Sequence, residues 1–108
     1  MANSIPASDV KVIIFACEAG MGSSLMGVNS LKKKLRKAKV KGVKVIHKPA
    51  RAIPKNAQVV VAHQGLAKTA RRKAPNAVVL GFKMFLNDPV FDKLVKALAN
   101  NEEIVEVG

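Results

Sequence analysis

The residues with the clearest chemical potential lie in one stretch, where a single cysteine follows a hydrophobic run and precedes a turn rich in glycine and serine. Residues 11–28 read KVIIFACEAGMGSSLMGV. The run from Val12 to Ala16 is apolar without polar alternation, which is typical of a strand buried on both faces of a sheet. Cys17 is therefore predicted at the carboxyl end of a strand, where ligands bind in open α/β sheets.

The turn after Cys17 has the features of an anion-binding loop. Gly20 and Gly22 lack a Cβ, so the backbone can turn tightly and come close to a ligand. Ser23 or Ser24 can cap the helix that begins there. The amide N–H groups of the loop and of the first helical turn have no intrahelical acceptor and carry the positive end of the helix dipole. We expect these donors to surround the Cys17 sulfur and to hold a phosphate on it.

The same donors favour the thiolate form of Cys17. A free cysteine has a pKa of about 8.5, and a helix N-terminus commonly lowers that value to roughly 3.5–7.5. We expect the pKa of the Cys17 thiol to be lowered in this way. An inert buried cysteine is the alternative interpretation of a lone cysteine, but a strand end followed by AGMGSS favours a reactive one.

Other chemistries fit the sequence less well. A dinucleotide fingerprint needs a third glycine at position 25, which is leucine, and an acidic residue about 20 positions later, whereas no Asp or Glu occurs between Glu18 and Asp88. One cysteine and two histidines offer no spacing typical of a metal site. His63 follows a predicted strand. It is either a surface residue or an accessory contact to the phosphate or to a partner.

Length and composition indicate one cytoplasmic domain. The chain has 108 residues, 49% of them hydrophobic, which suffices for one core but not for two. A single cysteine cannot form an internal disulfide and is typical of a reducing compartment. No apolar run approaches the roughly 20 residues that cross a bilayer, and the first ten residues carry no signal-peptide pattern. We expect no direct membrane insertion, so any membrane role would come through a partner.

Positive charge is concentrated in the middle of the chain. The formal net charge is +12, and 15 of the 19 basic residues fall between Lys32 and Lys73. Such a field attracts nucleic acid, an anionic membrane or an acidic protein. Tyrosine and tryptophan are absent, which disfavours the stacking platforms of single-stranded nucleic-acid binders. We expect the basic segments 32–37 and 71–73 to recruit an acidic partner. A basic nucleic-acid-binding domain, with the helix around 31–41 as its contact, is the alternative.

Strands alternate with helices along the chain. Helices are predicted over 25–39, which ends at Gly42, over 66–73, and from Pro89 to about residue 98. Further strands are predicted over 43–47, 57–62 and 77–80. This alternation predicts a single-domain α/β fold with a four-stranded parallel sheet in the order 2-1-3-4, flanked by helices and Rossmann-like. We divide the chain into a flexible leader (1–9), the domain (10–99) and a short acidic tail (100–108).

The stretch ACEAGMGSSLMG resembles the active-site loop of the IIB component of the bacterial sugar phosphotransferase system, most of all the mannitol type. The resemblance covers roughly residues 10–98 and includes VVVAHQGL at 59–66 and FLNDPVFDKLV at 85–95. Many relatives have Asp directly after the cysteine, where this chain has Glu18, which keeps the charge.

The resemblance implies a cytoplasmic phosphocarrier that uses a covalent phosphocysteine and no cofactor. In that family, a phosphohistidine of a IIA partner phosphorylates the cysteine, which then phosphorylates a sugar held by a membrane-embedded IIC permease. Cys17 is then the catalytic nucleophile, and mannitol or a related polyol or hexose is the expected sugar. The P-loop-like cradle for the phosphate consists of the backbone amides of Glu18, Ala19, Gly20, Met21, Gly22, Ser23 and Ser24.

A thiol enzyme resembling low-molecular-weight phosphatases or arsenate reductases is a further alternative, since these share the strand, cysteine, turn and helix. The phosphatase needs an arginine six positions after the cysteine, and here that position is Ser23. Its general acid would have to come from the region of Asp88. We therefore expect this loop to bind phosphate without strongly stabilising the transition state of hydrolysis.

Overall fold

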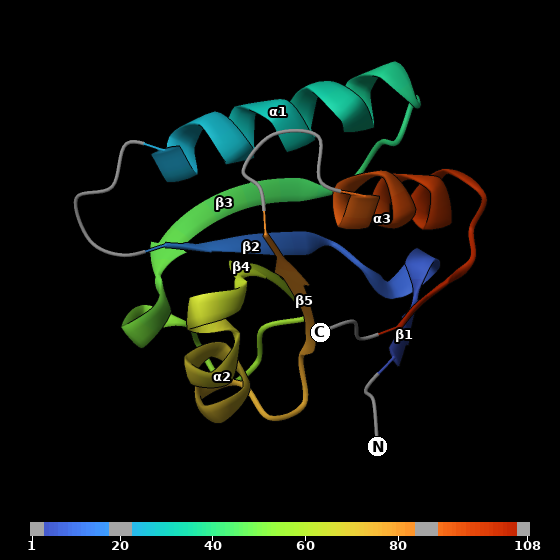
Figure 1. The fold of residues 1–108 in the computed structure, drawn as a ribbon. Helices are drawn as coiled ribbons and strands as arrows, with labels where there is room; N and C mark the ends of the chain where they lie inside the picture. Colours follow the sequence, from blue (N-terminus) through green and yellow to red (C-terminus); the bar gives the residue numbers. More distant parts are fainter. Residues whose placement is uncertain (1–3, 18–22, 84–88, 106–108) are drawn as a thin grey trace.

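A four-stranded parallel sheet lies at the centre of the fold, with helices on both faces (Figure 1). The computed structural model describes residues 4–17, 23–83 and 89–105. The sheet has the strand order β3-β2-β4-β5, which confirms the predicted order because β2 is its first strand along the chain. Its strands are β2 (Val12–Cys17), β3 (Lys44–Pro49), β4 (Val59–His63) and β5 (Val78–Phe82).

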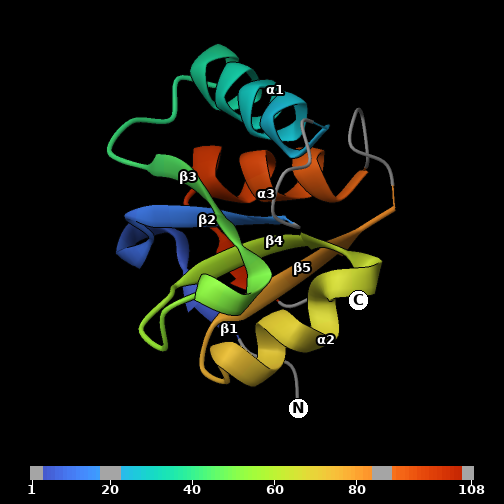
Figure 2. The same cartoon turned by 90° about the vertical axis from the view of Figure 1, so that its left-hand side faces the viewer.

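The two faces of the sheet are covered by different helices (Figure 2). Helices α1 (Ser23–Lys37) and α3 (Pro89–Ala99) lie on one face, and α2 (Gln64–Lys73) with the 3-10 turn η2 (Ala50–Ala52) lies on the other. Neighbouring residues of β2 belong to opposite faces: Phe15 packs with α1 and α3, and Ile14 packs with α2. The apolar run of β2 is therefore buried on both sides, as its lack of alternation predicted.

The face under α1 and α3 contains a cluster of three phenylalanines. The ring centroids of Phe15, Phe82 and Phe91 lie 5.2–6.1 Å apart, and all three side chains are buried. Gly27 of α1 lies directly over Phe15, since a Cβ built on Gly27 would come within 2.4 Å of the Phe15 Cζ atom. Only a glycine at this position lets α1 pack so close to β2.

The end of α1 differs from the expected glycine cap. Helix α1 ends at Lys37, and Lys39 adopts the left-handed conformation with φ 59°. The N–H of Val40 then donates to the carbonyl of Leu35 over 3.0 Å, which is the hydrogen bond of a Schellman motif. Gly42 also has a positive φ, of 80°, but it lies in the following loop, so the prediction that it ends the helix was wrong.

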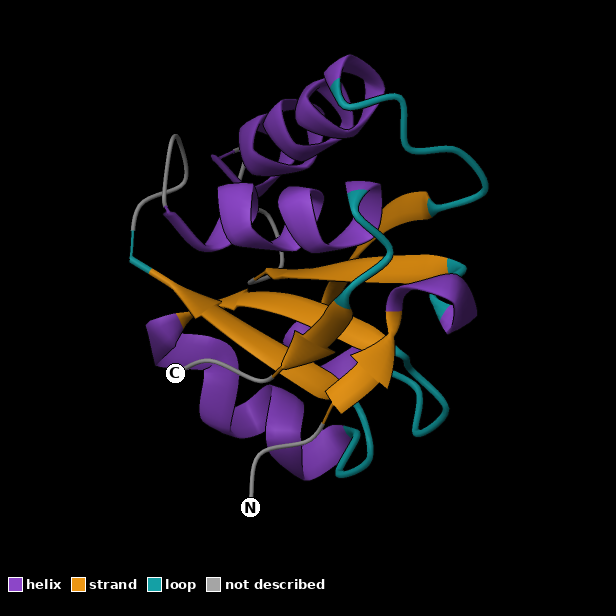
Figure 3. Ribbon diagram, turned by 90° about the vertical axis from the view of Figure 1, so that its right-hand side faces the viewer, coloured by secondary structure: helices purple, strands orange, loops and turns teal. Residues whose placement is uncertain are grey.

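A two-stranded antiparallel ribbon joins the terminal segments of the chain (Figure 3). It consists of β1 (Ser4–Pro6), which precedes the 3-10 turn η1 (Ala7–Asp9), and β6 (Glu103–Val105). Ile5 pairs with Ile104, and the Ile104 side chain is buried in the core under α1 and α3. Parts of both terminal segments therefore belong to the packed domain.

Where β2 begins, a side chain accepts the backbone hydrogen bonds on the side that faces β4. The Gln58 Oε1 atom accepts hydrogen bonds from the N–H groups of Lys11 at 2.7 Å and Val12 at 3.1 Å. Its Nε2 atom donates to the carbonyl of Asp9 over 2.7 Å. Gln58 directly precedes β4, so these hydrogen bonds hold the start of the central strand β2 against the start of β4.

The contact between Gly27 and Phe15 predicts that Gly27→Ala destabilises the fold. Overpacking a core typically costs about 1–3 kcal/mol, and alanine gains about 1 kcal/mol over glycine inside a helix. Because Phe15 is held by two other rings, we place the overpacking cost in the upper part of its range, and we expect the free energy of unfolding in urea to fall by about 1–2 kcal/mol in total. Asn29→Ala, at an exposed position of the same helix, is the control and should be neutral or slightly stabilising. A Gly27→Ala variant as stable as the parent would contradict the close packing.

Candidate functional site

The candidate site lies at the carboxyl ends of β2 and β4, where the order of the strands along the sheet reverses. Cys17 is the last residue of β2 and pairs with Pro49 of β3. On the other side Ala16 pairs with Ala62, so His63 is the next residue on the neighbouring strand, at a strand spacing of about 4.8 Å. The chain leaves β2 towards β3 and returns to β4 on the opposite side, which makes this edge the topological switch point.

Most of the loop that is predicted to bind phosphate lies outside the described residues. Glu18, Ala19, Gly20, Met21 and Gly22 lie outside the described residues, and so do the side chains of Cys17, Ser23 and Ser24. Helix α1 begins at Ser23, two residues earlier than predicted, so both serines belong to its first turn. The first turn of α1 thus follows within a few residues of the end of β2, at the same edge of the sheet (Figure 1).

Helix α1 is held in this position by one apolar stripe. Val28, Leu31 and Leu35 are buried against the sheet at the steps of three and four that the sequence predicted. The Gly27 contact with Phe15 adds a close approach near the N-terminal end of the helix. Since the first turn of any helix has N–H groups without intrahelical acceptors, the start of α1 is suited to hold an anion beside the end of β2.

His63 has a structural role that the sequence did not suggest. It is the N-cap residue of α2, and its Nδ1 atom accepts a hydrogen bond from the N–H of Gly65 over 3.2 Å. This bond needs an unprotonated Nδ1, so the neutral ring carries its hydrogen on Nε2. The ring also meets Phe82 edge to face, with centroids 5.7 Å apart. These two contacts fix the imidazole at the same edge as Cys17.

Basic residues follow the strand ends at this edge. Lys48 lies beside Ala16 in the register of β3 and β2, and Arg51 is in the turn η2 that follows β3. Lys83 directly follows the last residue of β5. Because α2 also begins at this edge, the positive end of a second helix dipole adds to these charges. The edge is therefore suited electrostatically to attract a phosphate.

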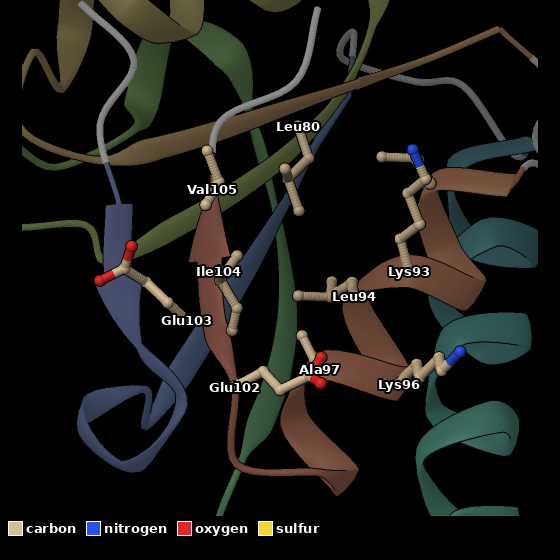
Figure 4. A pocket seen from close by; sticks show the side chains of 10 residues that line it. Leu80, Lys93, Leu94, Lys96, Ala97, Glu102, Glu103, Ile104 and Val105 are labelled. Atoms are coloured by element: carbon tan, nitrogen blue, oxygen red, sulfur yellow. The ribbon is translucent and has the colours of Figure 1, made fainter.

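A separate pocket of about 400 Å³ lies between α3 and β6 (Figure 4). Leu94 and Ile104 point towards one another across it, whereas Lys96 and Glu103 point in different directions. Its polar groups do not converge, and we regard it as an apolar gap beneath the terminal ribbon.

Within residues 4–17, 23–83 and 89–105, no three His, Cys, Asp or Glu side chains come together to hold a metal ion. No helix of the described part is long and apolar enough to span a membrane.

Comparison with known proteins identifies one family. The family described as "PTS system, Lactose/Cellobiose specific IIB subunit" matches residues 12–97. A relative from Buchnera aphidicola, named mannitol-specific EIICBA component, is 39% identical over 92% of this chain and 16% of its own length. Mannitol-specific EIICB components from Geobacillus stearothermophilus and Bacillus subtilis are 42% and 38% identical over 87% and 90% of this chain. The chain spans about a fifth of the length of these two relatives.

The geometry of His63 predicts different effects for two substitutions. His63→Ala removes both the cap and the ring contact with Phe82, whereas His63→Asn removes the ring contact but keeps a side chain that caps helices well. We expect the alanine variant to be less stable than the asparagine variant by about 1 kcal/mol in urea denaturation. Equal losses in the two variants would show that the hydrogen bond to Gly65 does not stabilise α2.

Proposed function

Since the chain belongs to the IIB family of the phosphotransferase system, we propose that it is a phosphocarrier whose Cys17 accepts a phosphoryl group and passes it on. The position of Cys17 supports this proposal most strongly: it ends the central strand at the switch point, directly before the loop that leads into α1. A single cysteine in the whole chain leaves no other thiol for the role.

In the first step, the Cys17 thiolate attacks the phosphorus of a phosphohistidine on a IIA partner. The P–N bond breaks as the S–P bond forms, and the imidazole of the partner leaves with the electron pair of the P–N bond. The backbone N–H groups from Glu18 to Ser24 hold the phosphoryl oxygens during the transfer, because donors placed where negative charge lies stabilise the transition state. No metal or organic cofactor is needed for this step.

In the second step, a sugar hydroxyl bound by a IIC permease attacks the phosphorus on Cys17. The S–P bond breaks, the O–P bond forms, and the hydroxyl proton passes to a base on the permease or to water, which restores the thiolate. The names EIICB and EIICBA of the relatives support these partners, since they combine a B component with C, and in one case with A, in one chain. The protein would then work in the cytoplasm, beside a membrane permease.

The residues around the loop favour transfer over hydrolysis. Ser23 stands where the resembling phosphatases have arginine, and it is the first residue of α1. The charges of Lys48, Arg51 and Lys83 lie at or just after the carboxyl ends of β3 and β5, where they would attract a phosphorylated partner. Binding without an arginine clamp leaves the hydrolytic transition state less stabilised, so the phosphocysteine would persist until a sugar arrives.

We propose mannitol as the sugar. The similar proteins are named mannitol-specific, and their identity of 38–42% extends over most of this chain. The description of the family names lactose and cellobiose instead. We give more weight to the individual relatives, because all three are named for mannitol.

The first prediction from this proposal concerns the phosphorylated residue. Incubation with a phosphorylated mannitol-type IIA protein should raise the mass of the intact chain by one phosphoryl group. Cys17→Ser should stay unmodified, because a serine hydroxyl is not ionised at neutral pH. Asn29→Ala, at an exposed position of α1 outside the cradle, is the control and should still be phosphorylated. An unmodified parent chain, or a phosphorylated Cys17→Ser variant, would contradict the role of Cys17.

The second prediction concerns the sugar. Membrane vesicles with the IIC part of a mannitol-specific relative, in which the relative's own IIB cysteine is replaced, should phosphorylate radiolabelled mannitol when this chain and phosphorylated IIA are added. The same vesicles with Cys17→Ser should form no product. Transfer to cellobiose or lactose through the corresponding permease, without transfer to mannitol, would contradict the proposed specificity and leave the carrier role intact.

A further inference from the structure

A groove of about 500 Å³ lies between the C-terminal half of α1 and the edge strand β3, and no step of the phosphoryl transfer uses it. Its floor is apolar and includes Leu35 and Val45, which are buried. Its rim is basic, since Lys32, Arg36 and Lys44 line it and are exposed. No acidic residue lines the groove in the described part of the chain.

Within the described part of the chain, no acidic side chain pairs with the charges of the rim. Among the described residues, the recorded ion pair of α1 joins Lys34 to Asp92 of α3 over 3.0 Å. Lys32, Arg36 and Lys44 have no ion-pair partner within the described ranges. Three cations of like charge around an apolar floor repel one another, and an anionic ligand that also covers the floor would relieve this repulsion.

The groove lies at the end of the sheet opposite to the candidate site. Lys44 pairs with Val12, which is five residues before Cys17 on β2, so about 16 Å of strand separates the two levels. The basic residues at the end of α2, which the sequence grouped with those of α1, lie on the other face of the sheet (Figure 2). The positive charge therefore forms at least two surfaces, and only the one on α1 borders this groove.

We propose that the groove docks an acidic protein segment that presents an aliphatic side chain between carboxylates. The carboxylates would meet Lys32, Arg36 and Lys44, and the aliphatic group would cover the half-buried side chains of Val40 and Val43, which also line the groove. A partner bound there leaves the carboxyl edge of the sheet open. The inference is independent of the phosphocarrier role, because docking needs neither the thiol nor the phosphate.

Other occupants match the surface less well. Nucleic acid has no aliphatic group for the floor, and Phe15, Phe82 and Phe91 are buried, so they offer no stacking surface. A membrane would need exposed apolar side chains to insert, and in the described part the one large exposed hydrophobic residue is Val105, on β6 away from the groove. A second copy of the chain would bring together two net charges of +12.

The test uses the full chain carrying Cys17→Ser and a short capped peptide in which glutamates flank two leucines. Binding followed by NMR should shift the amide signals of Leu35, Val45 and their neighbours, and it should weaken as salt rises. The triple variant Lys32→Glu, Arg36→Glu, Lys44→Glu should bind about tenfold or more weakly, since three attractions to the carboxylates become repulsions.

A matched variant separates the groove from net charge. Lys68→Glu, Arg72→Glu, Lys73→Glu changes the charge by the same amount at exposed positions of α2, and it should change the affinity by less than about twofold. An equal loss in both triple variants would overturn the proposal. So would equal binding of a peptide with serines in place of the leucines. Tighter binding of duplex DNA or of phosphatidylglycerol vesicles at the same signals would assign the groove to another class of ligand.

Discussion

The contact between the backbone of Gly27 and the ring of Phe15 determines where the candidate site can form. The ring of Phe15 has little room to move away from Gly27, because it packs against the rings of Phe82 and Phe91, whose centroids lie 5.2 and 6.1 Å from its own. Helix α1 therefore packs on β2 at a distance that any side chain at position 27 would prevent. Phe15 is two residues from Cys17, and Gly27 is one turn from the start of α1. One packing contact thus brings the N-terminus of the helix to the end of the strand that carries the cysteine.

The two faces of the sheet are packed with side chains of different size. The face under α1 and α3 is rich in large side chains, and the face under α2 contains several buried alanines, among them Ala62, Ala67 and Ala70. Small residues let α2 begin directly after β4, so His63 can end the strand and cap the helix at once. The carboxyl edge gathers the cysteine, the imidazole and helix N-termini, while the opposite end of α1 carries the basic groove.

The sequence predicted that Cys17 ends a strand, because this follows from a local pattern, and the alternation of strands and helices led to the predicted strand order. The unbroken apolar run of β2 and the steps of three and four in α1 report burial directly. The paired strands β1 and β6 could not be predicted, since three-residue strands are stabilised by partners that lie far away in the sequence. The left-handed Lys39 and the hydrogen bonds of Gln58 depend on tertiary contacts in the same way. The close contact at Gly27 could have been suspected from the sequence, because a glycine inside a predicted helix costs about 1 kcal/mol relative to alanine and usually has a packing reason.

The most direct measurement of the central claim is the pH dependence of alkylation of Cys17 by iodoacetamide in the folded protein. The chain has one cysteine, so mass spectrometry of the intact protein follows this thiol alone. If the start of α1 stabilises the thiolate at the end of β2, the alkylation rate should reach its half-maximum clearly below about pH 8.5, the pKa of a free cysteine. A midpoint at or above that value would show that the helix N-terminus does not act on the sulfur, and it would contradict the proposed origin of the nucleophile.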